Sequence, residues 1–307
     1  MRRGWICFSF FATLPAMTLF SIPSSAIAVN RPASGGPVIV SIPHAGRIYP
    51  PEILAAARVG REQLERLEDS WCDLIAGQAA DRGATVVQAV WARAVADCNR
   101  GEGQMAPGDV ALPLRAQFSA PGRKERAGLG VIPTRLADCG PLWRFPIDRH
   151  GLNWRLESFH RPYHLALSRE LVRARARFGH AVLIDLHSMP AIPAGQSGHG
   201  ARIVIGDRFG RTADDRITDA VVEHAERLDV AVTRNQPYAG GHIVSAHGRP
   251  DRSIHAVQIE IDRSLYLRSD RSPDHEAVVR MSEWFGGLID RLAGIAPGED
   301  EVPLAAE

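Results

Sequence analysis

Paired cysteines are absent from this sequence. The four cysteines, Cys7, Cys72, Cys98 and Cys139, form no CxxC motif and follow no regular spacing. Cysteine-based zinc sites and disulfide frameworks both need such spacing, so neither is expected to organise this protein. One incidental disulfide remains open if the chain is exported to an oxidising compartment.

The sequence also lacks an excess of charge of either sign. Its 36 lysines and arginines balance 35 aspartates and glutamates, which leaves a formal net charge of +1. Bulk electrostatics therefore gives no reason to expect a nucleic-acid or acidic-membrane partner. Lysine is scarce beside arginine, which we attribute to coding bias. With 45% hydrophobic and 23% charged residues among 307, the composition is that of an ordinary globular protein.

Beyond its N-terminus the chain has no run of the ~20 apolar residues that a membrane span needs. Residues 1–30 begin with two arginines, continue with a mostly apolar run and end near Ala-Ile-Ala, the layout of a secretory signal peptide. The alternative is an over-extended gene start, with the true start near Met17 or beyond. We therefore expect one folded domain over residues 31–295 and a flexible tail over 296–307.

Short apolar, β-branched segments alternate with segments of helical periodicity. The segments that predict strands are 37–43, 84–92, 180–188, 201–207, 230–235 and 255–261. The segments that predict helices are 61–82, 157–178, 212–228 and 274–293. This alternation predicts a single-domain α/β fold with a mixed, mostly parallel central sheet flanked by helices. Residues 101–150 lack periodicity and predict a long functional or flexible loop.

Polar side chains collect where several predicted strands end. His44 follows the first strand, the pair Asn99 and Arg100 follows the second, and His187 ends the third. Glu260 lies near the end of the last strand. Ligands of open α/β sheets bind beyond the carboxyl ends of the strands, so we expect these side chains to meet at one edge.

The stretch LIDLHSMP, residues 183–190, suggests how one imidazole is held. Asp185 and His187 are two apart on a strand and therefore face the same side. The carboxylate can accept the second N–H of the imidazole, as carboxylates do behind metal-bound histidines. Pro190 cannot extend the ladder, so the strand stops with the imidazole at its rim.

Two histidines and one carboxylate are the ligands of a catalytic zinc site with an open position for water. Such a metal acidifies its water and polarises a carbonyl, with Glu260 as general base and an Asn–Arg pair gripping a carboxylate. Simpler readings stay open for each residue: satisfied loop histidines, an ion pair between Glu260 and Arg263, or an Asp-Cys-Asn-Arg turn. HExxH, GxSxG, Walker and GxGxxG motifs are all absent, which removes several rival chemistries.

Several segments resemble the N-formylglutamate amidohydrolase family. They are VSIPHAGRIYP, RAVADCNR, GLGVIPTR, RPYHLAL, FGHAVLIDLHSMP, VIGDRFGRTAD, NQPYAGGHIVSAHGRP and HAVQIEIDRSLYL. They occur in order from about residue 37 to 290, and such an ordered series is far more specific than any single motif.

The resemblance implies a zinc-carboxypeptidase-like (phosphorylase/hydrolase-like) fold and an amidohydrolase domain over residues 31–295. It implies a metal-dependent amide hydrolase that cleaves N-formyl-L-glutamate, or a related N-acyl amino acid, to formate and glutamate. The expected cofactor is Zn²⁺, although other divalent metals suit such ligands. The alternatives are a zinc peptidase or amidase for another N-acyl amino acid or peptide, and a non-catalytic periplasmic binding protein. The resemblance implies a cytoplasmic enzyme, whereas a genuine signal peptide would make it periplasmic.

The resemblance also assigns roles to residues. It makes His44, Asp69 and His187 the metal ligands, with Asp73 as the alternative carboxylate, and Glu260 the base. Arg100 is expected to act in catalysis and in substrate binding. The further substrate-binding residues are Asn99, Arg93, Gly240 and Gly241, with His164, His242 and Arg144 as weaker candidates.

Overall fold

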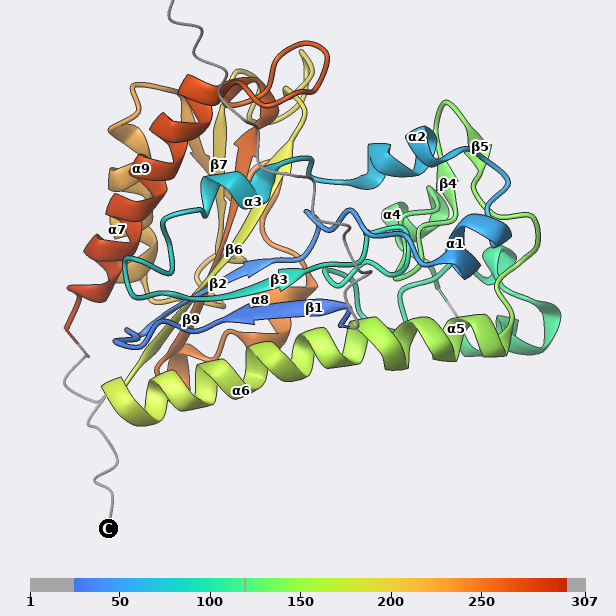
Figure 1. Cartoon of the computed structure of the whole chain (residues 1–307), viewed down its shortest axis with the longest axis horizontal. Coiled ribbons are helices and arrows are strands. Elements are labelled where there is room, and N and C mark those ends of the chain that lie inside the picture. Colours follow the sequence, from blue (N-terminus) through green and yellow to red (C-terminus); the bar gives the residue numbers. More distant parts are fainter. Residues whose placement is uncertain (1–24, 119, 297–307) are drawn as a thin grey trace, which may run out of the picture.

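The computed structural model describes residues 25–118 and 120–296 (Figure 1). The part of the predicted N-terminal segment up to residue 24, and the predicted tail from residue 297, lie outside the described residues. Within them, the prediction of a single-domain α/β fold with a mixed, mostly parallel sheet is confirmed. The sheet has seven strands in the order β1-β3-β2-β6-β9-β7-β8. They are β1 (Ile27–Asn30), β2 (Val38–Ile42), β3 (Thr85–Ala89), β6 (Ala181–Met189), β7 (Ile203–Gly206), β8 (Val232–Arg234) and β9 (Ile254–Asp262).

Strand direction concentrates the polar ends at one edge of the sheet. The strands β3, β2, β6 and β9 are mutually parallel. Strand β1 pairs antiparallel to β3, and β7 pairs antiparallel to β9 and parallel to β8. The carboxyl ends of the four central strands therefore share one edge. The first strand, β1, is built from residues that the sequence assigned to the N-terminal segment.

Helices cover both faces of the sheet (Figure 1). On one face, α6 (Arg161–Phe178) and α8 (His242–His247) pack on side chains such as Leu183 of β6. On the other face, α3 (Cys72–Ile75), α7 (Asp215–Glu226) and α9 (His275–Ala293) pack on the alternate residues of that strand. Strand β6 is buried throughout because helices press on both sides of it. No helix among the described residues is both long and apolar enough to cross a membrane.

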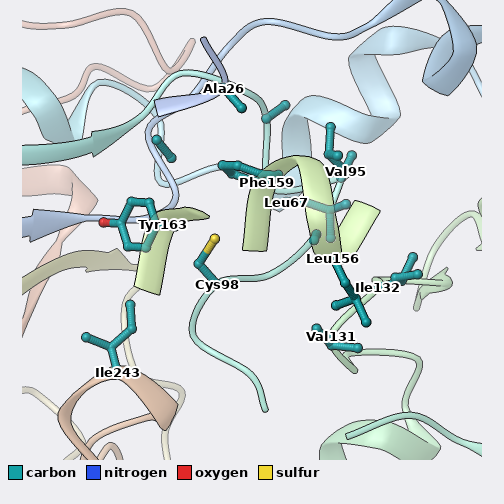
Figure 2. Close-up of a cluster of buried hydrophobic side chains, with 14 of the residues drawn as sticks. Ala26, Leu67, Val95, Cys98, Val131, Ile132, Leu156, Phe159, Tyr163 and Ile243 are labelled. Carbon is teal, nitrogen blue, oxygen red and sulfur yellow. The ribbon is translucent and has the colours of Figure 1, made fainter. Parts of the chain in front are cut away.

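The helix predicted over 157–178 begins earlier than expected. It is preceded by α5 (Arg149–Arg155) and a π-helical turn, Leu156–His160, before α6 continues to Phe178. Gly179 ends α6 with a φ of 82°, a conformation that glycine adopts at little cost. The π turn lies against a buried cluster to which distant segments contribute, among them Leu67, Val95 and Val131 (Figure 2).

The prediction of one helix over 61–82 is wrong. The segment is broken into α2 (Arg61–Leu64), a 3₁₀ turn (Glu65–Leu67) and α3. In the break, the Asp69 amide donates to the His44 carbonyl at 3.0 Å instead of continuing a helix. Trp71 adopts a φ of 60°, and its ring lies 4.4 Å beneath the guanidinium of Arg47. This tertiary pairing outweighs the local helical periodicity.

The segment 101–150 is irregular, as predicted, but much of it is anchored. Its apolar residues Val110, Leu114 and Val131 are buried in the cluster beneath the π turn. The remaining short elements of the described chain follow in order. They are α1 (Pro51–Ala56), η2 (Pro107–Asp109), η3 (Leu112–Gln117), α4 (Arg123–Arg126), β4 (Arg135–Leu136), β5 (Gly140–Pro141), η5 (Pro250–Arg252) and η6 (Arg263–Leu265).

Candidate functional site

Two imidazoles and one carboxylate meet at the carboxyl edge of the sheet. His44 follows β2, His187 lies in β6, and Asp69 comes from the broken helix. The Nδ1 atoms of His44 and His187 lie 3.3 and 3.0 Å from the same oxygen, Oδ2 of Asp69. All three residues are buried, and their candidate ligand atoms lie within 4.8 Å of one another. The group could therefore hold a metal ion.

A second carboxylate lies behind each imidazole. The Nε2 atom of His44 is 2.7 Å from Asp97 Oδ1, and that of His187 is 2.9 Å from Asp185 Oδ2. Because an ionised carboxylate only accepts, each Nε2 carries the proton in these contacts. This arrangement leaves Nδ1 of each ring to face Asp69, and fixes both rings as carboxylates do behind metal-bound histidines.

The backing carboxylates are themselves held. Asp185 Oδ1 accepts a hydrogen bond of 2.8 Å from Ser41, whose hydroxyl is 2.9 Å from that of Tyr163. Asp97 Oδ2 accepts from both Nε and Nη2 of Arg93, at 2.9 and 2.7 Å. Both imidazoles are therefore oriented through two layers of polar contacts.

The electrostatics of the group favour a cation. Burial alone would raise the pKa of Asp69, but hydrogen bonds from His187 and His44 outweigh it and hold that pKa well below its usual value. Burial alone would lower the pKa of His187, but the carboxylates of Asp185 and Asp69 raise it well above its usual value. The ionised carboxylates therefore stabilise positive charge at the position between the rings.

Glu260 lies beside His187 in the same cavity of about 320 Å³. The register of β6 and β9 pairs these two residues, so their side chains project from adjacent strands on one face. Oε1 of Glu260 accepts from Gln258 Nε2 at 2.8 Å, and Oε2 has no partner among the described residues. Burial and then the neighbouring Asp69 raise the pKa of Glu260, partly opposed by His187. A carboxylate whose pKa is raised is a stronger base, which suits it to accepting a proton.

Asn99 and Arg100 both line the cavity, but they differ in whether their side chains keep a hydrogen-bonding group without a partner. The Asn99 amide lies 3.2 Å from Gln258 Oε1 and 3.0 Å from His187 Nε2, and its oxygen accepts from the Ile243 amide. Arg100 uses Nε and Nη1 on backbone carbonyls only. Its Nη2 has no partner in the described chain, so Arg100 is the better placed of the two to bind an anion.

The two predicted glycines line the cavity for reasons set by the protein itself. Gly240 has a φ of 110°, which disfavours any other residue. A Cβ on Gly241 would lie 2.3 to 2.5 Å from the side-chain amide of Asn99. The absence of Cβ at Gly241 therefore allows Asn99 to occupy its position beside His187.

Other sequence candidates lie outside the cavity or are already paired. Asp73 forms a bidentate ion pair with Arg47 and belongs neither to the cavity lining nor to the group of candidate ligands. Arg93 lines the cavity but is committed to Asp97. The rings of His164 and His242 pack against each other, 5.2 Å apart, outside the cavity lining. Arg144 is exposed and also absent from that lining.

Sequence reasoning missed several residues of the site, among them Asp97, Arg263 and Lys124. Asp97 lies in an irregular turn, where its position depends on the tertiary fold, although an acidic residue among Ala, Val and Cys is a signal of a buried role. Arg263 donates to Asp69 Oδ1 at 3.1 Å from the turn after β9. Lys124 lines the cavity from α4, in the segment expected to be a loop. Because lysine is rare in this sequence, Lys124 could have been singled out as a candidate.

These features define an α/β protein with a candidate metal site and an acidic residue at the carboxyl edge of its sheet. The profile of the family described as N-formylglutamate amidohydrolase matches residues 36–267. The chain belongs to this family. The resemblance drawn from the sequence is thereby confirmed, as is the prediction of an enzyme of this family, which acts on an amide bond.

Two named relatives and one solved structure agree with this assignment. The chain is 33% identical over 238 residues to an N-formylglutamate deformylase of Pseudomonas putida, a match covering 75% of this chain and 82% of the relative. It is 29% identical over 261 residues to the N-formylglutamate deformylase of Pseudomonas aeruginosa, covering 80% and 90%. The crystal structure of an N-formylglutamate amidohydrolase from Ralstonia eutropha superposes with a TM-score of 0.81 at 28% identity, covering 88% of this chain and 97% of that one.

Proposed function

We propose that this protein is a divalent-metal-dependent hydrolase that cleaves N-formyl-L-glutamate to formate and glutamate. The observation that carries the proposal is the convergence of His44 Nδ1 and His187 Nδ1 on one oxygen of Asp69, next to Glu260. The names of its relatives supply the substrate.

The residues at this convergence fit a metal ion. His44, Asp69 and His187 would hold it, and Asp97 and Asp185 would keep each Nε2 protonated so that Nδ1 is available. Two imidazoles and a carboxylate are donors that zinc favours, although cobalt, nickel or manganese suit them as well. When bound, such an ion polarises the formyl carbonyl and acidifies water.

Glu260 acts as the general base and then as the general acid. Its Oε2 takes a proton from the attacking water and later delivers that proton to the departing glutamate nitrogen. Gln258 holds the other oxygen of the same carboxylate, which fixes its orientation towards the cavity. Burial supports this role because it raises the pKa of Glu260 above its ordinary value, which makes the carboxylate a stronger base.

Arg100 binds the substrate and stabilises developing negative charge. Its guanidinium carries a positive charge with no carboxylate partner in the described chain, and Nη2 remains for a ligand. Asn99 supports it by holding the loop that carries Arg100, since its side chain donates to Gln258 Oε1 and accepts from the Ile243 amide. Because the formyl group is small, selectivity rests on the contacts to the amino-acid part of the substrate.

Removal and return of the metal test this proposal. Purified protein treated with a chelator should release no formate from N-formyl-L-glutamate, and one equivalent of Zn²⁺ should restore the activity. N-acetyl-L-glutamate and short peptides are assayed in parallel, since preferred turnover of either would replace the proposed substrate. Full activity of the metal-free protein would contradict metal dependence, and metal binding without turnover of any substrate would contradict the hydrolase itself.

A further inference from the structure

Lys124 is the only lysine in the chain, and every other basic side chain apart from histidine is an arginine. This one ammonium group lines the cavity that contains His44, His187 and Glu260. It lies on α4 and keeps much of its surface accessible, which places it on the outer wall rather than at the base of the site.

The backbone ties Lys124 to Arg100. The Leu129 amide donates to the Lys124 carbonyl at 2.9 Å, and the Leu129 carbonyl accepts from Arg100 Nε at 3.1 Å. The residue after Lys124 is the buried Glu125, which accepts from Gln104 Nε2 at 3.0 Å. These hydrogen bonds hold α4 next to the loop of Arg100, so Lys124 and Arg100 lie on the same part of the cavity wall.

Four arginine or lysine side chains line the cavity. Two of them are paired with carboxylates, and two are not paired with any in the described chain. Arg93 is neutralised by Asp97 and Arg263 by Asp69. Arg100 donates only to backbone carbonyls. The ammonium group of Lys124 has no hydrogen bond or ion pair with any described residue.

Lys124 and Arg100 are therefore two neighbouring cations without a counter-anion. Although much of the residue is accessible, partial burial of its ammonium group, and then the charge of Arg100, lower the pKa of Lys124, so the two cations disfavour each other when no anion is bound. A ligand with two negative charges would satisfy both groups, since each could take one carboxylate.

We infer that Lys124 is a specificity-determining residue that binds the side-chain carboxylate of the substrate while Arg100 binds its α-carboxylate. The site would thus select N-acyl amino acids that carry two carboxylates. This inference rests on the proposed function and adds to it the residue that reads the second charge.

Paired substrates test the inference. N-formyl-L-glutamate and N-formyl-L-glutamine have nearly the same size, but only the first carries the second charge. Lys124→Met should lower kcat/KM for N-formyl-L-glutamate by about 10- to 100-fold, mainly through KM, because it removes a charged contact. The same variant should leave kcat/KM for N-formyl-L-glutamine within about twofold, and Lys124→Arg should retain most of the preference.

The matched control is Arg123→Met, which removes the neighbouring exposed cation of α4, a residue absent from the cavity lining. It should leave both substrates unaffected. An equal fall for both substrates in Lys124→Met, or no fall, would overturn the inference.

A labelling experiment separates this inference from the proposed function and needs no turnover. Pyridoxal phosphate followed by borohydride modifies lysine, and peptide mapping reports Lys124 alone as the internal site. Glutarate, a dianion, should protect Lys124 from modification, whereas butyrate at the same concentration should not. Absent protection would refute the role of Lys124 even in an active enzyme. Protection without formate release by the wild type would refute the proposed function and keep a dicarboxylate site.

Discussion

At the scale of single residues, the site depends on carboxylates that never face the substrate. Asp97 and Asp185 each accept from the Nε2 of one imidazole and so decide which nitrogen faces Asp69. Asp97→Asn should lower the affinity for zinc about 10- to 100-fold, because an amide is a weaker acceptor than a carboxylate. A competition titration against a chromophoric chelator measures this affinity.

The control for that titration is Asp73→Asn, which removes a carboxylate that pairs with Arg47 away from the two imidazoles. It should bind zinc as the wild type does. Equal losses of affinity in both variants would mean that Asp97 acts only through general stability.

Glu260 carries the second prediction at this scale. Glu260→Gln keeps the shape of the side chain but cannot accept the proton of the attacking water. We expect kcat to fall by about 10²- to 10⁴-fold while the zinc content stays at that of the wild type. Formate release and metal analysis of the same sample check both parts, and a kcat near the wild-type value with metal bound would exclude Glu260 as the base.

The site residues that could be predicted from the sequence are those that lie on or next to strands. His187 and Glu260 end or lie near the end of apolar runs, and the period of two along a strand suffices to predict that Asp185 lies behind the imidazole. Asp97 and Lys124 escaped it because irregular turns set their positions. Such turns leave no periodicity in the sequence, and their conformation depends on contacts with distant segments.

At the scale of elements, the strands were predictable and one helix was not. The continuous apolar character of β6 predicted a strand buried on both faces, and both of its faces are covered. In the segment 61–82, Leu64, Leu67 and Ile75 are all buried, and their spacing also suits a helix. The break between them arises from the backbone pairing of Asp69 with His44, a contact between segments that periodicity cannot report. The misprediction thus falls on the carboxylate of the candidate metal site.

The π turn and α6 position the loop that carries Asn99 and Arg100. His160 Nε2 donates to the Arg100 carbonyl at 2.7 Å, and His164 Nε2 donates to the Cys98 carbonyl at 2.9 Å. The wider first turn of this helix brings both imidazoles to the same loop, which is a common use of π-helical turns near functional sites.

His164 is therefore predicted to be a positioning residue. His164→Ala should lower kcat/KM by about tenfold, since one hydrogen bond holding the loop is lost. His164→Gln retains an N–H donor and should recover part of that loss. Steady-state kinetics on N-formyl-L-glutamate gives both values.

The structure offers a matched control on the opposite face of the sheet. His224 is also buried and donates to a backbone carbonyl, that of Trp284, at 2.9 Å between α7 and α9. His224→Ala should reduce thermal stability to a similar degree but leave kcat/KM unchanged. A similar loss of kcat/KM in this variant would assign both histidines a purely structural role.

At the scale of the whole molecule, buried neutral histidines make stability depend on pH. Burial, followed by repulsion from neighbouring histidines, lowers the pKa of His164 to about 2 and that of His247 to about 4. The two rings are hydrogen bonded, with 2.9 Å between Nδ1 of His164 and Nε2 of His247. In the unfolded chain their pKa returns to the ordinary value, so unfolding takes up protons below about pH 6.5.

The sign of the effect follows from this uptake. Both folded pKa values are depressed, so stability is fully present above about pH 6.5 and is lost below it, down to about pH 4 for His247 and about pH 2 for His164. His247→Gln should make the decline in unfolding free energy shallower, by up to about 1.4 kcal/mol per pH unit within that window. Urea unfolding between pH 7.5 and 4.5, with a chelator present, measures the slopes. Parallel slopes for the variant and the wild type would show that His247 is protonated in the folded state.

The central claim is that residues from three distant segments bind one metal ion, and anomalous diffraction at the zinc edge tests it most directly. Crystals of the zinc-loaded protein should give one peak about 2.0 to 2.2 Å from Nδ1 of His44, Nδ1 of His187 and a carboxylate oxygen of Asp69. A protein that turns over N-formyl-L-glutamate with no peak at this position, or with its metal bound elsewhere, would contradict the account.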